Sequence, residues 1–471
     1  MGELWQLGAV ELAGRIRDGS TSSSEVLEAH LGRIDEVNGH LNAVVRVLAA
    51  EARAAAAAAD RAVANGEPLG PLHGVPITVK ENIDLAGTPT TQGLRALAEA
   101  VATTDAPSVA RMRAAGAIPF ARTNLPDLGL RVHTDSDLHG LTRNPWNPDV
   151  TAGGSSGGEA SAIASGMSPL GIGNDIGGSL RNPAHCCGIA SIKPSAGVVA
   201  MATEIEPIDM RISSQLMVVE GPMARSVADV RAGLIALAGP DVRDPRSLPA
   251  RLTDLDPGQR LTIAVLADPP AGPTDPGIAA GVRRAADALA DAGHHVVEAT
   301  PPGYAETLEL WQALLLADVR AQYELIAAVM GEGGRAVLAL FGADGPPPVE
   351  TEMLAGHARR FALMREWSLF FVDHPVLLSP TWALPAFEHG ADARATSSEA
   401  MLATIRPVLP MNLLGLPSAV VPAGLADGLP VGVQVVGDRF TDLRCLAVAE
   451  QIEAALGVLT PIDPVTTRPA G

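Results

Sequence analysis

The chain has 471 residues, of which 47% are apolar, 18% are charged and only 3% are aromatic. This composition is typical of a soluble globular protein and excludes intrinsic disorder as the main state. The 34 basic and 53 acidic residues give a net charge of −19, which repels nucleic acid and anionic membrane surfaces, so we expect neither as a partner.

The sequence predicts a cytoplasmic protein. No apolar run approaches the ~18 residues of a membrane span, and the residues from Met1 to Gln6 lack the basic and apolar regions of a signal peptide. The three cysteines, Cys186, Cys187 and Cys445, are too few for a disulfide framework. No Cys or His pair has zinc-finger spacing, and we expect neither a metal nor a cofactor.

The N-terminal segment 1–66 is predicted to be helical. Leu7, Val10, Leu12 and Ile16 recur with helical periodicity. A Ser-rich stretch at 21–24 is typical of an N-cap and opens a second helical segment over 26–37. An Ala-rich run over 54–64 indicates a third helix with a solvated face.

Further along, predicted helices and strands alternate. The first strand, Val75 to Val79, is a short apolar run that stops at Lys80. Further strands are expected at 117–121, 261–266, 295–299, 375–380, 418–421 and 431–436, and further helices at 108–115, 277–292 and 441–456. The segment 303–372 is helical throughout except for an interruption at 342–348, and we interpret it as a helical cap or insertion. Alternation of this kind favours an α/β fold with helices on both faces of a sheet.

The two lysines of the chain are candidates for proton transfer. Of the 34 basic residues only Lys80 and Lys193 are lysines. Arginine serves wherever a permanent positive charge suffices, but only lysine has an amine that can lose its proton. Lys80 follows a predicted strand and is a candidate base, whereas a structural role is the favoured interpretation for Lys193, which precedes Pro194.

Two loops rich in glycine and serine carry the densest chemical signal, at 151–158 and 173–181. Glycine lets consecutive backbone N–H groups converge on one ligand atom. Phosphate binding is disfavoured, because no lysine follows a glycine and Ile176 stands where the dinucleotide pattern needs glycine. Gly153, Ser155 and Gly157 match the nucleophile elbow of α/β-hydrolase esterases, but turn residues at 143–149 replace the strand that should precede it.

A serine nucleophile served by a lysine base is the third interpretation of these loops. A lysine amine has a reference pKa of about 10.4 and must lose about 3 units, or about 4 kcal/mol, to act as a base near neutrality. Burial at a strand end supplies such a shift. The S-x-x-K spacing of penicillin-binding enzymes is absent, so the fold must bring Lys80 to its serine.

Motifs along most of the chain then indicate a family. They are Gly74 to Asn82, Gly87 to Gly93, Asn144-Pro145-Trp146, both Gly/Ser loops, Cys187-Gly188, Lys193-Pro194, Gly221 to Ser226, Gly415-Leu416-Pro417 and Gly428 to Gly432. In this order they resemble the amidase signature enzymes, which hydrolyse amides with a Ser-Ser-Lys triad. The joint signal is highly specific.

The resemblance implies a role for each matching residue. Ser179 is expected to be the nucleophile, Ser155 the bridging serine, which in the family follows a cis peptide, and Lys80 the base. The expected oxyanion hole consists of the backbone N–H groups of Ile176, Gly177, Gly178 and Ser179. Supporting roles in the loops fall to Ser156, Asp175 and Arg181.

The resemblance also implies the fold and its organisation. We expect a single α/β/α layered domain over 1–471, in which helices cover a central twisted mixed β-sheet. Within it, 1–66 forms N-terminal helices, 67–230 the signature core, and 303–372 the cap that contributes to the substrate pocket. For assembly we consider a homodimer.

The expected activity is hydrolysis of a carbon–nitrogen amide bond through a serine acyl-enzyme. The Leu, Met, Phe and Trp content of 303–372 and of the loop 125–137 favours a small apolar or aryl amide. Esters and carbamates pass through the same tetrahedral intermediate and remain open as substrates.

Two other functions stay open. One is the glutaminase subunit of a tRNA-dependent amidotransferase, but 195–200 lacks the aromatic and arginine expected there, and Ser214 to Met217 replaces an Asp-Gln run. The other is a non-catalytic binding protein on the same scaffold, which the presence of all three triad residues disfavours.

Overall fold

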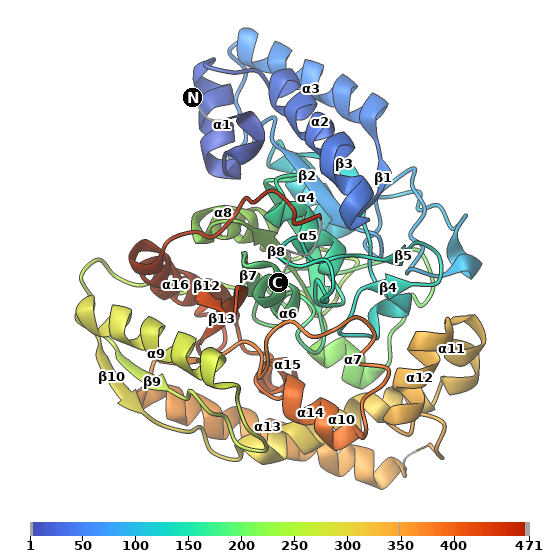
Figure 1. The fold of residues 1–471 in the computed structure, drawn as a ribbon, viewed down its shortest axis with the longest axis vertical. Coiled ribbons are helices and arrows are strands. Elements are labelled where there is room, and N and C mark those ends of the chain that lie inside the picture. The colour runs from blue at the N-terminus through green and yellow to red at the C-terminus, as the bar shows by residue number, and fades with distance from the viewer. Residues whose placement is uncertain (1–2, 348, 467–471) are drawn as a thin grey trace.

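The computed structural model describes residues 3–347 and 349–466. Helices lie on both faces of one large mixed sheet (Figure 1). From one edge to the other, the 11-stranded sheet consists of β1 (Val44–Val47), β3 (Ile118–Thr123), β2 (Pro76–Lys80), β6 (Leu170–Asp175), β8 (Val219–Ala224), β7 (Ala190–Lys193), β12 (Ser418–Ala426), β13 (Leu429–Val436), β11 (Val376–Pro380), β9 (Thr262–Val265) and β10 (His295–Glu298). β4 (Asp135–Ser136) and β5 (Gly140–Leu141) form a separate hairpin. The predicted α/β fold class is therefore confirmed.

The helices that surround the sheet come from the whole described chain. They are α1 (Ala9–Asp18), α2 (Ser23–Leu41), α3 (Ala49–Ala64), α4 (Pro107–Ala114), α5 (Gly157–Ala164), α6 (Arg181–Cys187), α7 (Ile212–Met217), α8 (Val227–Leu237), α9 (Pro276–Asp291), α10 (Tyr304–Arg320), α11 (Tyr323–Val329), α12 (Glu332–Leu340), α13 (Glu350–Asp373), α14 (Ser398–Ile405), α15 (Leu409–Leu414) and α16 (Asp442–Leu456), with short 3-10 turns at Leu4–Gln6, Arg95–Leu97 and Asp127–Gly129.

The N-terminal helices begin where local chemistry places them. Ser22 caps α2 and shares a capping box with Glu25, so each satisfies a backbone N–H that the first helical turn leaves free. The Ala-rich α3 is less exposed than expected. Ala52, Ala56 and Ala59 form a buried stripe of that helix, in the same core cluster as side chains of α2.

Strand β6 was not predicted as a strand, and its glycines explain why. Alternating glycines weaken the apolar pattern that indicates a strand. They are needed because α5 packs closely against it: a Cβ on Gly171 would lie 1.7 Å from Oε1 of Glu159. Glu159 is wholly buried in α5. Close packing of α5 on β6 brings the two Gly/Ser loops together.

The segment 304–373 forms α10 to α13. The break between α12 and α13 lies where the interruption was expected, but the helix is also interrupted at 321–322 and 330–331, which the sequence did not predict. Figure 1 shows these helices, in yellow to orange, grouped beside one end of the molecule. A second core cluster with many aromatic side chains joins them to the sheet, including Trp311, Leu363, Trp367 and Phe371.

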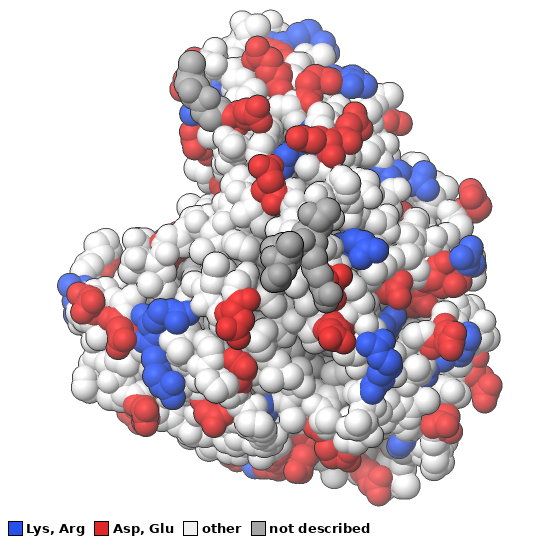
Figure 2. Space-filling view, viewed as in Figure 1, with Lys and Arg blue, Asp and Glu red and all other residues white. Residues whose placement is uncertain are grey.

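Acidic and basic side chains are interspersed over the face drawn in Figure 2, without an extended basic area. That face therefore has no extended positive surface that would bind a polyanion. Within the described residues, no helix combines the length and apolar character that crossing a membrane requires.

Candidate active site

Lys80 lies at the carboxyl end of β2 and points at two polar partners. Its Nζ donates to Oγ of Ser155 at 2.7 Å and to Oδ1 of Asn174 at 2.6 Å. β6, which ends beside it, runs parallel to β2, so the carboxyl ends of both strands meet at one edge of the sheet. The structure thus brings Lys80 and Ser155 together across 75 positions of the sequence.

The surroundings of Lys80 favour a neutral amine. The side chain has no exposed surface, and burial lowers the pKa of Lys80 to about 7, against the opposing pull of the carboxylates of Asp175, Glu159 and Glu220. Burial also raises the pKa of Glu159 to about 7, so that carboxyl is a weaker counter-charge than an ionised glutamate. An amine with this pKa takes up and releases a proton near neutrality.

Ser155 is held in a tightly packed turn that leads into α5. The Gly154–Ser155 peptide is cis. A Cβ on Gly154 would lie 2.5 Å from the backbone nitrogen of His133, and one on Gly129 would lie 3.2 Å from Oγ of Ser155. At position 154 only glycine permits this close approach of neighbouring backbone.

Ser179 follows β6 in a loop organised by Asp175. The Asp175 carboxylate accepts hydrogen bonds from the backbone N–H groups of Gly178 at 2.8 Å and Leu180 at 3.1 Å. Ser156 N–H donates to the Ser179 carbonyl at 3.2 Å and so connects this loop to the other Gly/Ser loop.

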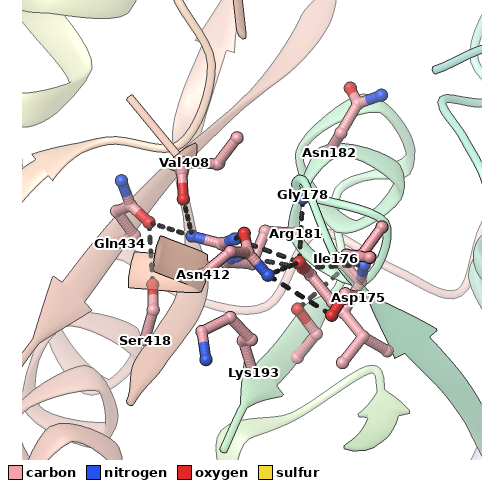
Figure 3. A network of polar contacts seen from close by, with 12 residues as sticks. Asp175, Ile176, Gly178, Arg181, Asn182, Lys193, Val408, Asn412, Ser418 and Gln434 are labelled. Carbon is pink, nitrogen blue, oxygen red and sulfur yellow. Dashed lines mark hydrogen bonds and ion pairs between the residues drawn. The ribbon is translucent and has the colours of Figure 1, made fainter. Parts of the chain in front are cut away.

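Arg181 secures Asp175 from the other side (Figure 3). Its Nε and Nη2 donate to the two carboxylate oxygens at 3.0 and 3.1 Å, and both side chains are wholly buried. Burial by itself raises the pKa of Asp175, but the Arg181 guanidinium outweighs it and holds that pKa well below its usual range. The remaining N–H groups of Arg181 reach Asn412, Gln434 and the Val408 carbonyl.

The amides expected to form the oxyanion hole differ in availability. The Gly178 N–H points at Asp175 and is already engaged. The N–H groups of Ile176, Gly177 and Ser179 have no acceptor among the described residues. Three of the four predicted oxyanion donors are therefore unoccupied by acceptors in the described part of the chain, whereas Asp175 uses the fourth to shape the loop.

Two residues of the site were not predicted. Asn174 accepts from Lys80 and lies directly before Asp175, inside a motif that the sequence had already marked. Trp311 of α10 donates from Nε1 to the Ile176 carbonyl at 3.0 Å, and a Cβ on Gly177 would lie 2.7 Å from its ring. No local signal connects position 311 to position 176, so only the packing of α10 reveals this contact.

A cavity of about 710 Å³ opens onto the two serines. Ser155, Ser179, Asn174 and Ile176 border it. Much of its apolar lining comes from the 94–97 turn, the 128–130 loop, α10 and α11, and includes Leu94, Leu97, Leu128, Leu130, Leu315, Val319, Leu325, Ile326 and Val329. The segment 201–218 contributes further apolar side chains, among them Met201, Ile208, Met210 and Val218.

Other reactive side chains of the described chain lie apart from this chemistry. The second buried lysine, Lys193, donates to the carbonyl of its neighbour Pro194 at 2.9 Å. Cys186 and Cys187 are buried in α6, and burial raises the pKa of both thiols. Among the described residues, no three His, Cys, Asp or Glu side chains are grouped as a metal site would require.

Comparison with known proteins assigns the family. The family model Amidase matches residues 25–446 of the chain. The chain belongs to the amidase signature family. The residues before the loop at 151–158 form turns and isolated bridges rather than a strand, so the nucleophile-elbow alternative lacks its defining element in this amidase.

Three relatives illustrate the range of this family. The chain is 40% identical to an indoleacetamide hydrolase of Bradyrhizobium diazoefficiens, over 97% of this chain and 88% of that protein. It is 32% identical to a glutamyl-tRNA(Gln) amidotransferase subunit of Salinispora arenicola, over 98% and 99% of the two chains. A bacterial aryl acylamidase of the amidase signature family superimposes with a TM-score of 0.82 at 29% identity, covering 96% of each chain.

Proposed function

We propose that this amidase hydrolyses a small apolar or aryl amide through an acyl-enzyme on Ser179, with Ser155 as proton bridge and Lys80 as base. The observation that carries the proposal is the 2.7 Å hydrogen bond between the buried Lys80 amine and Ser155, beside a cavity that Ser179 also borders. A neutral buried amine next to a hydroxyl is the arrangement that activates a serine nucleophile.

In the proposed mechanism, Ser179 Oγ attacks the amide carbonyl carbon while its proton passes to Ser155, whose own proton passes to Lys80. Free N–H groups of the 176–179 loop stabilise the oxyanion, each worth about 10²–10³ in rate. The protonated Lys80 returns a proton through Ser155 to the leaving nitrogen as the carbon–nitrogen bond breaks. Water then attacks the acyl-enzyme by the same relay and releases the acid.

The apolar side of the cavity supports the proposed substrate class. The side chains of α10 and α11 face the two serines across a space large enough for a small aromatic ring system. The names of two relatives, indoleacetamide hydrolase and aryl acylamidase, also favour an aryl amide. Esters and carbamates of the same shape are further proposed substrates, because they form the same tetrahedral intermediate.

Labelling with a fluorophosphonate tests the nucleophile. We expect one label per wild-type chain, attached to Ser179, and no label on folded Ser179→Ala protein, which should also lose all turnover of an aryl amide. Peptide mapping by mass spectrometry locates the adduct. A label found on Ser155 or Ser156 would contradict the proposed order of the triad.

A further inference from the structure

Two buried carboxyl groups that the hydrolytic mechanism does not use border the cavity. Asp84 and Glu220 both border it, with 1% and 4% of their surfaces exposed. Asp84 follows β2 beyond Lys80, and Glu220 lies near the start of β8. A carboxylate removed from water needs a charged or hydrogen-bonding partner to offset the lost hydration.

Strand pairing places Glu220 close to the triad. Glu220 is the register partner of Asn174 across β6 and β8. Paired residues point to the same face of a sheet, with Cβ atoms about 4.5–5.5 Å apart. Since Asn174 accepts from Lys80, Glu220 lies on the face of the sheet that carries the reacting groups.

Neither carboxylate is fully satisfied within the described residues. Oδ2 of Asp84 accepts from the Glu204 backbone N–H at 2.6 Å, but Oδ1 has no partner, and neither has Oε2 of Glu220. Burial raises the pKa of Glu220 to about 7. The carboxylates of Asp84 and Asp244 push it in the same direction, against the opposing effects of Ser108 and of the Lys80 charge. Burial without an ion-pair partner accounts for both observations.

Three arginines of the described chain border the cavity, and none of them contacts Asp84 or Glu220. Arg211 donates to the Ala321 carbonyl at 3.2 Å. Arg246 pairs with Asp244 at 3.0 Å, and Arg243 pairs with Asp241 at 3.0 Å.

The buried cations nearby are engaged as well. Lys80 donates to Ser155 and Asn174. Arg122 donates to the Thr88 hydroxyl and to the Ile83 carbonyl. Its Nε has no partner among the described residues, and its charge interacts with Asp84 without forming an ion pair. Among the described residues, no Lys, Arg or His forms an ion pair with Asp84 or Glu220.

We propose that Asp84 and Glu220 form a subsite for a protonated amine of the substrate. The inference rests on the proposed function and narrows its substrate class to amides that combine an apolar body with an ammonium group. The apolar body lies against α10 and α11, the amide carbonyl at Ser179, and the ammonium group beside the two carboxyl groups. Hydrogen bonds between an ammonium group and a carboxylate are stronger than those between neutral groups.

Two isosteric anilides test the subsite. In δ-aminovaleryl anilide an ammonium group replaces the terminal methyl group of hexanoyl anilide, so the pair differs in charge at constant length. We expect wild-type protein to prefer the amino substrate by about 10- to 100-fold in kcat/KM, as one charged hydrogen bond provides. Aniline release measures both rates.

The variants Glu220→Gln and Asp84→Asn keep the shape of each side chain and remove its charge. Each should reduce that preference by about fivefold or more, through a higher KM for the amino substrate. Glu51→Gln, on the exposed surface of α3, is the matched control and should retain the wild-type preference. Equal preferences in Glu220→Gln and the control, or no preference in the wild type, would overturn the proposal.

Calorimetry with n-pentylammonium makes the test independent of activity and of variant folding. The ion should bind wild-type protein, whereas n-pentanol should bind at least about tenfold more weakly. Equal binding of the two would reject the subsite. Suppose that hexanoyl anilide is hydrolysed and Ser179 is labelled, but that the amino substrate is not preferred: the subsite is then wrong and the proposed function stands. Absence of both turnover and label would reject the proposed function instead.

Discussion

At the scale of single residues, Lys80 links burial to reactivity. Its amine loses hydration and gains only neutral hydrogen-bonding partners, so the uncharged form becomes accessible near pH 7. Asp175 shows the opposite outcome in an equally buried place, because Arg181 supplies a full counter-charge. Burial therefore does not determine ionisation by itself; the charge of the contacting side chain does.

The pH profile provides a prediction at this scale. The proposed base works when Lys80 is neutral, so kcat/KM for an uncharged amide should rise with pH and level off above an apparent pKa of about 7. Lys80→Met should lower kcat by about 10²-fold or more and remove this acidic limb. Steady-state rates between pH 5 and 9, with an amide that has no titrating group, measure both effects.

Lys193 provides the matched control for that prediction. It is the only other lysine of the chain, it is equally buried, and burial lowers its pKa to about 7 as well. Its Nζ contacts the Pro194 carbonyl rather than a serine. Lys193→Met should therefore keep the acidic limb at its wild-type position. If the acidic limb disappeared in Lys193→Met and persisted in Lys80→Met, the base would be Lys193 and the proposal would be wrong.

At the scale of elements, α10 joins the cap to the catalytic loop. The Trp311 indole donates to the Ile176 carbonyl and lies against Gly177, so the position of this helix affects the amides proposed to hold the oxyanion. Trp311→Phe keeps an aromatic ring and removes the N–H, leaving a carbonyl with a lost hydrogen bond worth about 1–3 kcal/mol. We expect kcat to fall about tenfold or more, with a smaller change in KM.

Trp367 in α13 is the comparison for this helix contact. Its Nε1 also donates to a backbone carbonyl, that of Pro302, at 2.8 Å, and its side chain is wholly buried. Trp367→Phe should lower the melting temperature without the loss in kcat. If both variants lowered kcat equally, the effect would be one of general stability and not of loop position.

At the scale of the whole molecule, members of this family can act as free-standing hydrolases or as one subunit of an amidotransferase, so two functions are compatible with family membership. The 40% identity to an indoleacetamide hydrolase favours the first, as do the altered residues at 195–200 and 214–217. We predict that the purified 48.4 kDa chain releases ammonia or amine from a small amide without other subunits. Activity that appeared only after coexpression with partner subunits would favour the amidotransferase.

Several elements of this fold can be predicted from the sequence alone. The N-cap in the Ser-rich stretch at 21–24, the strand that ends at Lys80 and the alternating elements around 261–299 depend on neighbours within a few residues. The structure has them where the patterns indicate. The motifs that carry the family resemblance also lie in short contiguous stretches. Local propensity and local motif therefore suffice for fold class, family and the choice of candidate triad residues.

Tertiary structure alone decided what surrounds those candidates. Strand β6 is hidden in the sequence by glycines that it needs only because α5 packs against it, and Trp311 meets Ile176 across 135 positions. Asp84 and Glu220 border one cavity because strands distant in sequence are neighbours in the sheet. Burial, missing counter-charges and cavity shape are properties of packed groups in space, so no pattern of neighbouring residues encodes them.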